Sequence, residues 1–171
     1  MTNRSFDAVT ALIVEDNRHM RALLRALLHA LGIRTVFEAS DGAVGLVQLR
    51  ERRPDLVLAD LSMKPVDGIE FTLQVRNSPD SPNPYVPIIM VTGHTEKSRV
   101  EAARDAGVTE LLAKPITVAN LAQRLIEIVD RPRAFVRCPG YFGPDRRRHQ
   151  PKGYVGPFRR RDDFENDVEA R

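Results

Sequence analysis

Apolar residues follow two alternating patterns along the first 130 residues. Short continuous runs, such as residues 9–14, are rich in β-branched side chains, which is typical of strands buried on both faces. Between these runs, apolar residues recur every three or four positions, as they do from Met20 to Leu31 before Gly32, and this spacing predicts helices. Strands are expected at residues 9–14, 33–38, 56–59, 86–91 and 110–113, and helices at residues 19–31, 42–53, 67–76, 95–106 and after Thr117.

Five strand–helix units joined by short links predict an α/β protein: a (βα)5, doubly wound parallel sheet covered by helices on both faces. We assign this domain to residues 8–130. Beyond it, the helical periodicity disappears, and five of the twelve prolines fall within 41 residues. Residues 131–171 are therefore expected to form an irregular, arginine-rich C-terminal extension. No DNA-binding or catalytic output domain is expected in so short a segment, and we expect no enzyme activity.

Charge is divided unevenly between these two parts. Residues 1–130 carry 15 Lys and Arg against 17 Asp and Glu, whereas residues 131–161 carry ten basic residues and a single acid, Asp145. A mildly acidic body with a basic appendage predicts an anionic ligand on the appendage. The last ten residues hold five acids and one arginine. Their opposite charge suggests that they shield the preceding arginines before a ligand binds.

Cysteine content and hydropathy bear on the cellular compartment. The single cysteine, Cys138, excludes an internal disulfide and a thiolate metal cluster. No apolar run reaches the ~18 residues needed to cross a bilayer, and the N-terminus lacks an apolar signal core. We therefore expect a cytoplasmic protein with no membrane insertion.

Polar side chains gather where the predicted strands end. In a parallel α/β sheet the functional crevice lies outside the carboxyl ends of the strands. The side chains expected there are Glu15, Asp16, Asp60, Thr92 and Lys114. Clustered carboxylates need a compensating cation, and Mg²⁺ prefers oxygen ligands. A carboxylate beside a metal, an ammonium group and a hydroxyl forms a binding site for a phosphoryl group, with the carboxylate as nucleophile.

Residues 8–130 resemble a response-regulator receiver domain of the CheY type, which has a flavodoxin-like fold. The resemblance lies in the segments Val14-Glu15-Asp16, Asp55-Leu56-Val57-Leu58-Ala59-Asp60, Met63-Lys64-Pro65-Val66-Asp67-Gly68, Val91-Thr92-Gly93 and Ala113-Lys114-Pro115. It implies that Asp60 accepts the phosphoryl group, with a histidine kinase as a donor. It also implies that Glu15, Asp16, Asp60 and the backbone carbonyl of Ser62 bind Mg²⁺, that Thr92 and Lys114 contact the phosphoryl group, and that Lys114-Pro115 is a cis bond.

Two features depart from the receiver pattern. Receivers carry Tyr or Phe three residues before the lysine, and that ring moves inward on phosphorylation, whereas this chain has Leu111 there. Leucine cannot reproduce the movement of a ring or its polar tip, which argues against the usual switch. A proline-rich insert at residues 78–84 also precedes the fourth strand. The main input is therefore expected to lie outside the phosphoryl site.

The extension uses one motif twice. Residues 141–148 read aromatic, spacer, Gly-Pro, a variable residue and three arginines, and the pattern returns thirteen residues later at 154–161. Arginine matches phosphate oxygens or the O6 and N7 atoms of guanine, and its plane or an aromatic ring can stack on a base. Asp145 can accept hydrogen bonds from guanine. A compact ligand with two guanines and two phosphates, such as cyclic di-GMP, fits this pattern.

The extension also resembles that of Cle proteins, CheY-like effectors of cyclic di-GMP. The matching segments are Arg137-Cys138-Pro139-Gly140-Tyr141, Gly143-Pro144-Asp145-Arg146-Arg147-Arg148 and Gly156-Pro157-Phe158-Arg159-Arg160-Arg161. The resemblance implies ligand-induced ordering and docking on the flagellar motor switch protein at the cell pole, with control of motility and surface attachment. The candidate ligand-binding residues are Arg133, Arg137, Tyr141, Asp145, Arg146, Arg147, Arg148, Tyr154, Phe158, Arg159, Arg160 and Arg161.

The two arginine units differ, because Phe158 in the second unit replaces Asp145 of the first, so the two units are expected to bind differently.

Two other functions stay open. A basic segment rich in proline and glycine is also typical of disordered or nucleic-acid-binding tails. The chain would then be a phosphorylation-controlled, single-domain response regulator whose tail binds nucleic acid or an acidic partner protein. A phosphate sink with a passive tail is the remaining alternative.

Overall fold

The computed structural model describes residues 6–93 and 97–146. Its centre is a five-stranded parallel sheet with the strand order β2-β1-β3-β4-β5. The strands are β1 (Thr10–Val14), β2 (Thr35–Ala39), β3 (Leu56–Asp60), β4 (Ile88–Thr92) and β5 (Glu110–Ala113). The helices are α1 (Arg18–Ala30), α2 (Gly42–Arg52), α3 (Gly68–Asn77), α4 (Lys97–Asp105) and α5 (Val118–Asp130). The predicted (βα)5 doubly wound fold is confirmed.

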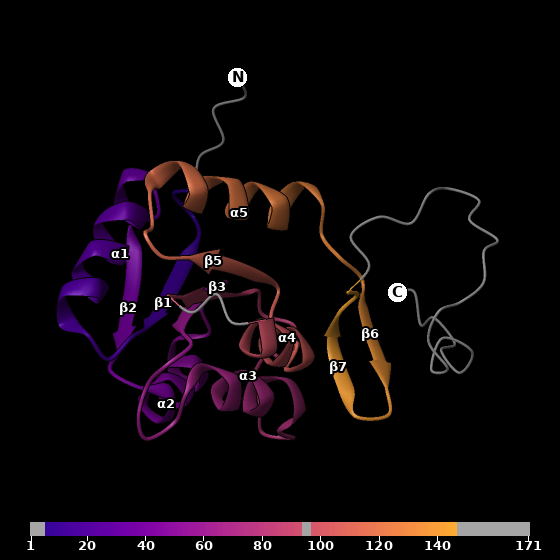
Figure 1. The fold of residues 1–171 in the computed structure, drawn as a ribbon. Coiled ribbons are helices and arrows are strands. Elements are labelled where there is room, and N and C mark those ends of the chain that lie inside the picture. Colours follow the sequence, from indigo (N-terminus) through magenta and orange to yellow (C-terminus); the bar gives the residue numbers. More distant parts are fainter. Residues whose placement is uncertain (1–5, 94–96, 147–171) are drawn as a thin grey trace.

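Helices cover the sheet on both faces, with α1 and α5 on one and α2, α3 and α4 on the other (Figure 1). Every residue of β3 and β4 is buried, because each central strand has helices above and below it. Each face has its own apolar core, built around Phe71 on the α3 side and Leu28 on the α1 side. Among the described residues, no helix is long and apolar enough to cross a membrane.

Side-chain caps explain where several helices begin. Asp67 accepts a hydrogen bond from the Glu70 amide at 2.8 Å and caps α3, at the start of the helix predicted from residue 67. Thr117 caps α5, and its partner Asn120 completes a reciprocal capping box. These caps fix the first turns of the two helices that follow β3 and β5. They therefore also hold the loops between β3 and α3 and between β5 and α5, which carry part of the candidate site.

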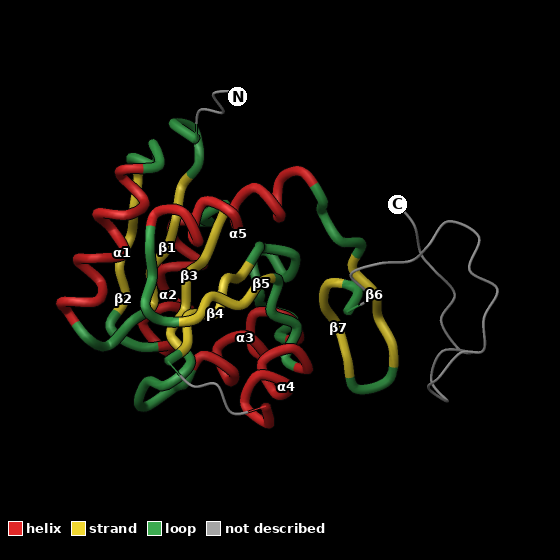
Figure 2. The backbone as a smooth tube through the Cα atoms, turned by 45° about the horizontal axis from the view of Figure 1, so that its top comes forward, coloured by secondary structure: helices red, strands yellow, loops and turns green. Residues whose placement is uncertain are grey.

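The extension begins with a β-hairpin, which corrects the expectation of an irregular tail from residue 131. Strand β6 (Phe135–Cys138) pairs antiparallel with β7 (Tyr141–Pro144). The two-residue turn contains Gly140 at a φ of +78°, a conformation that glycine adopts without strain. The hairpin lies beside the ends of α3 and α4 (Figure 2). The sequence gives little indication of this hairpin, because each of its strands has only four residues.

An aromatic cluster fixes the hairpin to the domain. The ring of Tyr85 lies 5.1 Å from that of Phe135 and 5.3 Å from that of Phe142, both in edge-on geometry. Tyr85 directly follows the proline-rich insert, so this departure from the receiver pattern contributes to the surface that receives the hairpin. The insert and the first part of the extension are therefore one structural feature.

Buried Arg76 of α3 completes this junction. Its Nε donates to the Gly107 carbonyl at 2.9 Å, and its Nη1 donates to the Pro84 carbonyl at 2.7 Å. Its guanidinium also lies over the Phe135 ring, 5.1 Å from the centroid. Gly107 has a φ of +96°, and a Cβ there would come within 2.6 Å of the Phe142 carbonyl. The hairpin backbone thus approaches the domain at a position that only glycine permits.

Candidate functional site

The carboxyl edge of the sheet brings together an ammonium group and two buried carboxylates. Asp60 ends β3, Glu15 follows β1, and Lys114 follows β5. The Lys114 Nζ atom lies 2.8 Å from Asp60 Oδ1 and 3.5 Å from Glu15 Oε2. Thr92, at the end of β4, is buried at the same edge. The sequence prediction that these strand ends converge is borne out for Glu15, Asp60 and Lys114 by these distances.

Backbone geometry holds Asp60 in place. The amide of Ser62 donates to Asp60 Oδ2 at 2.8 Å, while Oδ1 receives the lysine. Gly68, the first residue of α3, lies so close that an added Cβ would collide with the Asp60 carbonyl and with the Met90 sulfur. The lack of a side chain at Gly68 therefore allows the start of α3 to approach the end of β3. The two oxygens of the Asp60 carboxylate are held by the Ser62 amide and by Lys114. The Lys114–Pro115 bond is cis, as the receiver resemblance implies.

Burial and charge act on the pKa values of Glu15 and Lys114 in different ways. Burial raises the pKa of the Glu15 carboxyl above its usual value, and the charge of Asp60 raises it further. Burial alone would lower the pKa of the Lys114 ammonium, but the hydrogen bond and charge of Asp60, with the charge of Glu15, raise it above its usual value. The site therefore favours a cation and disfavours a second unneutralised carboxylate.

These residues fit a magnesium ion that keeps several waters. Within residues 6–93 and 97–146, no three His, Cys, Asp or Glu side chains form a ready metal centre. The implied set includes three carboxylates, those of Glu15, Asp16 and Asp60, and these three are therefore not gathered around one point in this conformation. Mg²⁺ typically takes one or two carboxylates and keeps several waters, which the buried pair Glu15 and Asp60 supplies together with the Ser62 carbonyl. Glu15 Oε2 is buried and accepts no hydrogen bond, and its contact with Lys114 Nζ is a 3.5 Å ion pair. A divalent cation would satisfy this oxygen, and exposed Asp16 adjoins it in the chain.

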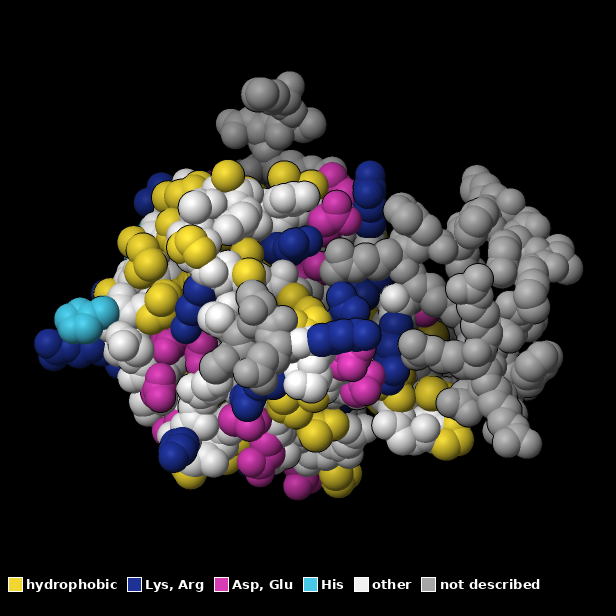
Figure 3. Space-filling view, in the orientation of Figure 1, with side chains coloured by type: hydrophobic (Ala, Val, Ile, Leu, Met, Phe, Trp, Pro, Cys, Tyr) yellow, Lys and Arg dark blue, Asp and Glu magenta, His cyan; other side chains and the backbone are white. Residues whose placement is uncertain are grey.

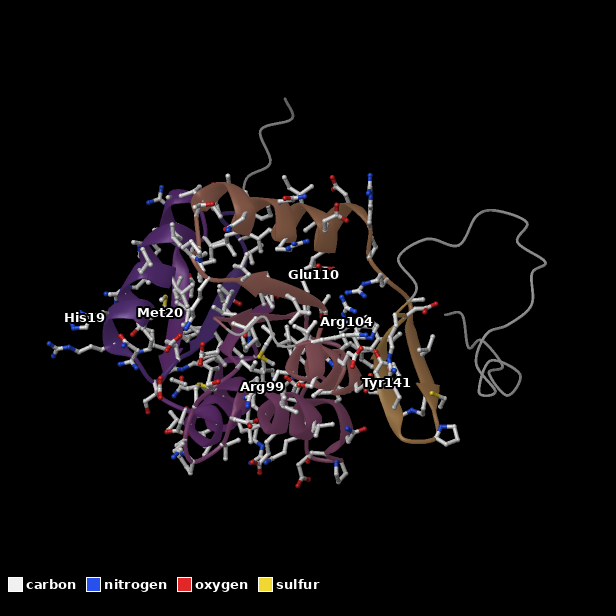
Figure 4. All side chains as sticks on the ribbon, viewed as in Figure 1. His19, Met20, Arg99, Arg104, Glu110 and Tyr141 are labelled. Carbon is white, nitrogen blue, oxygen red and sulfur yellow. The ribbon has the colours of Figure 1, made fainter. Side chains whose placement is uncertain are left out.

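Arg99 of α4 is a neighbour of this edge that the sequence reasoning missed. Its Nη2 lies 3.5 Å from the Ser62 hydroxyl, and its position on α4 is seen in Figure 4. A second cation therefore stands near the phosphoacceptor candidate. Nothing in the spacing of α4 marks Arg99, because the helix also carries Lys97 and Arg104, and only the fold selects which of them faces Ser62.

Tyr141 and Arg146 of the extension contact each other. The Tyr141 ring is buried, its hydroxyl donates to the Pro144 carbonyl at 2.6 Å, and the Arg146 guanidinium covers the ring at 3.9 Å from its centroid. In this conformation the ring stacks on an arginine of its own motif. Because the ring is buried, the flat group nearer to solvent at this place is the Arg146 guanidinium.

The other described ligand candidates divide between two places. Arg133 donates to Glu110 Oε1 at 3.1 Å and to the Asp145 carbonyl at 3.2 Å, next to Arg146. Arg137 instead lies over the Phe142 ring at 4.1 Å. The remaining candidates lie outside the described residues: Arg147, Arg148, Tyr154, Phe158, Arg159, Arg160 and Arg161.

A parallel five-stranded α/β domain with Asp60, Glu15 and Lys114 at its carboxyl edge has the architecture of a signalling receiver. The chain belongs to the family described as "Response regulator receiver domain", whose model matches residues 11–126. Receiver domains are signalling modules.

Three relatives illustrate the match. The chain is 40% identical over 114 residues to the KDP operon transcriptional regulatory protein KdpE of Escherichia coli K12, covering 67% of this chain but only 48% of KdpE. It is 32% identical to the chemotaxis protein CheY-3 of Vibrio cholerae, covering 70% of this chain and 91% of that protein. A solved receiver domain of the sensor histidine kinase PA1611 from Pseudomonas aeruginosa PAO1, with a magnesium ion in its active site cleft, gives a TM-score of 0.61 at 31% identity, covering 70% of this chain and 94% of that one.

Proposed function

We propose that this chain is a phosphoacceptor response regulator that also binds cyclic di-GMP through its arginine-rich extension. In this proposal it docks on the flagellar motor switch protein and controls motility and surface attachment. The phosphoacceptor part rests on one observation: the 2.8 Å contact between Lys114 Nζ and buried Asp60 Oδ1 at the carboxyl edge of the sheet. The motor part draws support from the likeness to a chemotaxis protein. Docking places the protein in the cytoplasm, at the motor.

The proposal gives a role to each side chain of the edge. An Asp60 oxygen would attack the phosphorus of a phosphohistidine on a histidine kinase, forming an acyl phosphate as the phosphorus–nitrogen bond breaks. Lys114 and Thr92 would hold oxygens of the transferred group. Glu15, Asp16, Asp60 and the Ser62 carbonyl would hold Mg²⁺, which supplies charge neutralisation for the phosphoryl oxygens. The direct contact between Lys114 and Asp60 supports this role for Lys114.

Replacing Glu15 tests the magnesium assignment. Because the pKa of Glu15 is raised, its ionised form costs folding free energy once the pH exceeds the usual value of 4.5. Glu15→Gln should therefore stabilise the metal-free protein at pH 7, and this gain should vanish as the pH falls below 4.5. Added Mg²⁺ should raise the free energy of unfolding of the wild type more than that of the variant. Urea titrations with and without Mg²⁺ measure both effects.

Exposed Glu51 of α2 offers the matched control. Glu51→Gln should show the wild-type response to Mg²⁺ and no stabilisation at pH 7. An equal response of Glu15→Gln and wild type to Mg²⁺ would remove Glu15 from the ligand set.

The cyclic di-GMP part rests on the chemistry of the extension. The motif at residues 141–148 offers three successive arginines, and the first of them, Arg146, stacks on Tyr141 with its Nη1 2.8 Å from an Asp105 carboxylate oxygen. A guanidinium that is planar, exposed on one side and already holding an anion suits a phosphate or a guanine base. The hairpin places this arginine against the receiver domain.

A titration of the full chain with cyclic di-GMP tests this part. Binding by calorimetry at micromolar affinity or better is expected for the wild type. The double substitution Arg146→Ala and Arg147→Ala should weaken it about 100-fold, because each charge-assisted hydrogen bond contributes about 1.5 kcal/mol or more and 1.4 kcal/mol is tenfold. Arg34→Ala with Arg50→Ala removes two exposed arginines of the receiver domain and should leave the affinity unchanged.

A second candidate function remains, in which the tail binds nucleic acid or an acidic partner protein. The ion pair between Arg146 and Asp105 favours it, because it shows this arginine holding a protein carboxylate. This candidate predicts no response to cyclic di-GMP, and partner binding that depends on phosphorylation of Asp60. The wild-type titration therefore separates the two.

A further inference from the structure

A pocket of about 270 Å³ lies between the receiver domain and the hairpin. It is bounded by α4, β5 and the extension, and it is lined by Arg104, Val108, Thr109, Glu110, Leu111, Arg133, Tyr141, Pro144 and Arg146. Figure 3 shows Lys and Arg side chains gathered beside the hairpin, and Figure 4 places Arg104, Glu110 and Tyr141 at this junction. The pocket is separate from the Asp60 edge, because neither Asp60 nor Lys114 lines it.

Three guanidinium groups line the pocket, and they are engaged to different degrees. Arg133 is paired with Glu110, whose other carboxylate oxygen lies 3.6 Å from Arg124. This buried carboxylate is therefore already neutralised by two arginines. Arg146 is paired with Asp105, whose side chain is 63% exposed. An exposed ion pair of this kind is weak and can be exchanged for a stronger anion.

Arg104 differs from the other two arginines of the pocket. Within the part of the chain that the structure describes, it forms no hydrogen bond and no ion pair, and it is exposed in the last turn of α4. The neighbouring residue Asp105 holds Arg146 instead. The pocket thus offers one uncommitted guanidinium and a second whose partner is exchangeable, and both line the same cavity.

The stack of Arg146 on Tyr141 gives the pocket a flat wall. Tyr141 is anchored through its hydroxyl to the Pro144 carbonyl, and the guanidinium lies over its ring. Arginine planes stack on nucleobases as aromatic rings do. A base could extend this stack while its phosphate reaches Arg104. The volume lies just under the ~300–1,000 Å³ typical of sites for drug-sized ligands, which suits one nucleotide unit.

We propose that this junction pocket binds one guanine nucleotide half of cyclic di-GMP, so that Arg104 of the receiver domain belongs to the ligand site. The inference rests on the proposed function and deepens it, because the extension alone would not make the whole site. The ligand phosphate contacts Arg104 and replaces Asp105 on Arg146, and the base stacks on the Arg146 plane. Leu111 lies in the same pocket wall, so the ligand reaches the position where other receivers carry their switch ring.

Calorimetric titration of the full chain with cyclic di-GMP tests this assignment. Arg104→Ala should weaken binding about tenfold, through the loss of one charge-assisted contact, and Arg104→Lys should weaken it less. Lys97→Ala is the matched control, since it removes one positive charge from the same helix outside the pocket, and it should bind as the wild type does.

Asp105→Asn provides the opposite change. Freeing Arg146 from its carboxylate should tighten binding several-fold, whereas Glu101→Gln, which removes the exposed partner of Lys97 on the same helix, should leave the affinity unchanged. If the wild type binds cyclic di-GMP while Arg104→Ala and Lys97→Ala have the same affinity as it does, the junction pocket is not the site. If the wild type does not bind, the proposed function itself fails.

Discussion

Asp60→Asn is expected to abolish phosphoryl uptake completely. Asp60 is the carboxylate that Lys114 contacts at 2.8 Å, and the Ser62 amide fixes its second oxygen. An asparagine amide is nearly the same shape but lacks the anionic oxygen that would attack phosphorus. Incubation with acetyl phosphate and Mg²⁺ should add one phosphoryl group to the wild type and none to the variant, as read by intact-protein mass spectrometry.

Two controls make this outcome specific. Asp80→Asn changes an exposed acid in the loop after α3 and should be phosphorylated as the wild type is. Chelation of Mg²⁺ should suppress the reaction of the wild type, since the phosphoryl oxygens would lose a neutralising cation. Phosphorylation of Asp60→Asn to the wild-type extent would show that another side chain is the acceptor.

The sheet and its site could be predicted from the sequence because their signals are local. Continuous apolar runs identify strands that are buried on both faces, and the topology of a parallel sheet then brings their carboxyl ends to one edge. The site residues Glu15, Asp60 and Lys114 are far apart in the chain, but each of them ends or directly follows a strand. The positions of the strand ends are therefore enough to predict that the three side chains lie at the same edge of the sheet.

The junction could not be predicted because it depends on contacts between distant segments. The hairpin strands are only four residues long, and they are too short to be recognised from their apolar residues alone. What those residues pack against becomes clear only from the fold, which places Tyr85 beside Phe135. Arg76 looks in the sequence like an ordinary basic residue near a helix end. Its burial follows from the three segments that surround it, and not from its own neighbours in the chain.

Arg76→Ala is expected to lower the free energy of unfolding by about 3 kcal/mol and to release the hairpin. The substitution would leave two inward-facing carbonyls, those of Pro84 and Gly107, without their donor, and it would open a cavity beside Phe135. Burial lowers the pKa of Arg76 to about 10, which reflects a largely dehydrated cation that needs these partners. Urea denaturation measures the loss of stability, and amide hydrogen exchange over residues 135–144 measures the release.

Two further variants separate docking from a general loss of stability. Arg50→Ala removes an exposed arginine of α2 and should leave both measurements unchanged. In a double-mutant cycle, Arg76→Ala and Phe135→Ala should couple by about 1 kcal/mol or more, because the guanidinium and the ring are in direct contact. Additive effects, with hairpin exchange as slow as in the wild type, would mean that Arg76 stabilises only α3. Coupled effects would make Arg76 the link through which the receiver domain holds Tyr141 and Arg146 at the junction pocket, and Arg76→Ala would then also weaken ligand binding without touching the ligand.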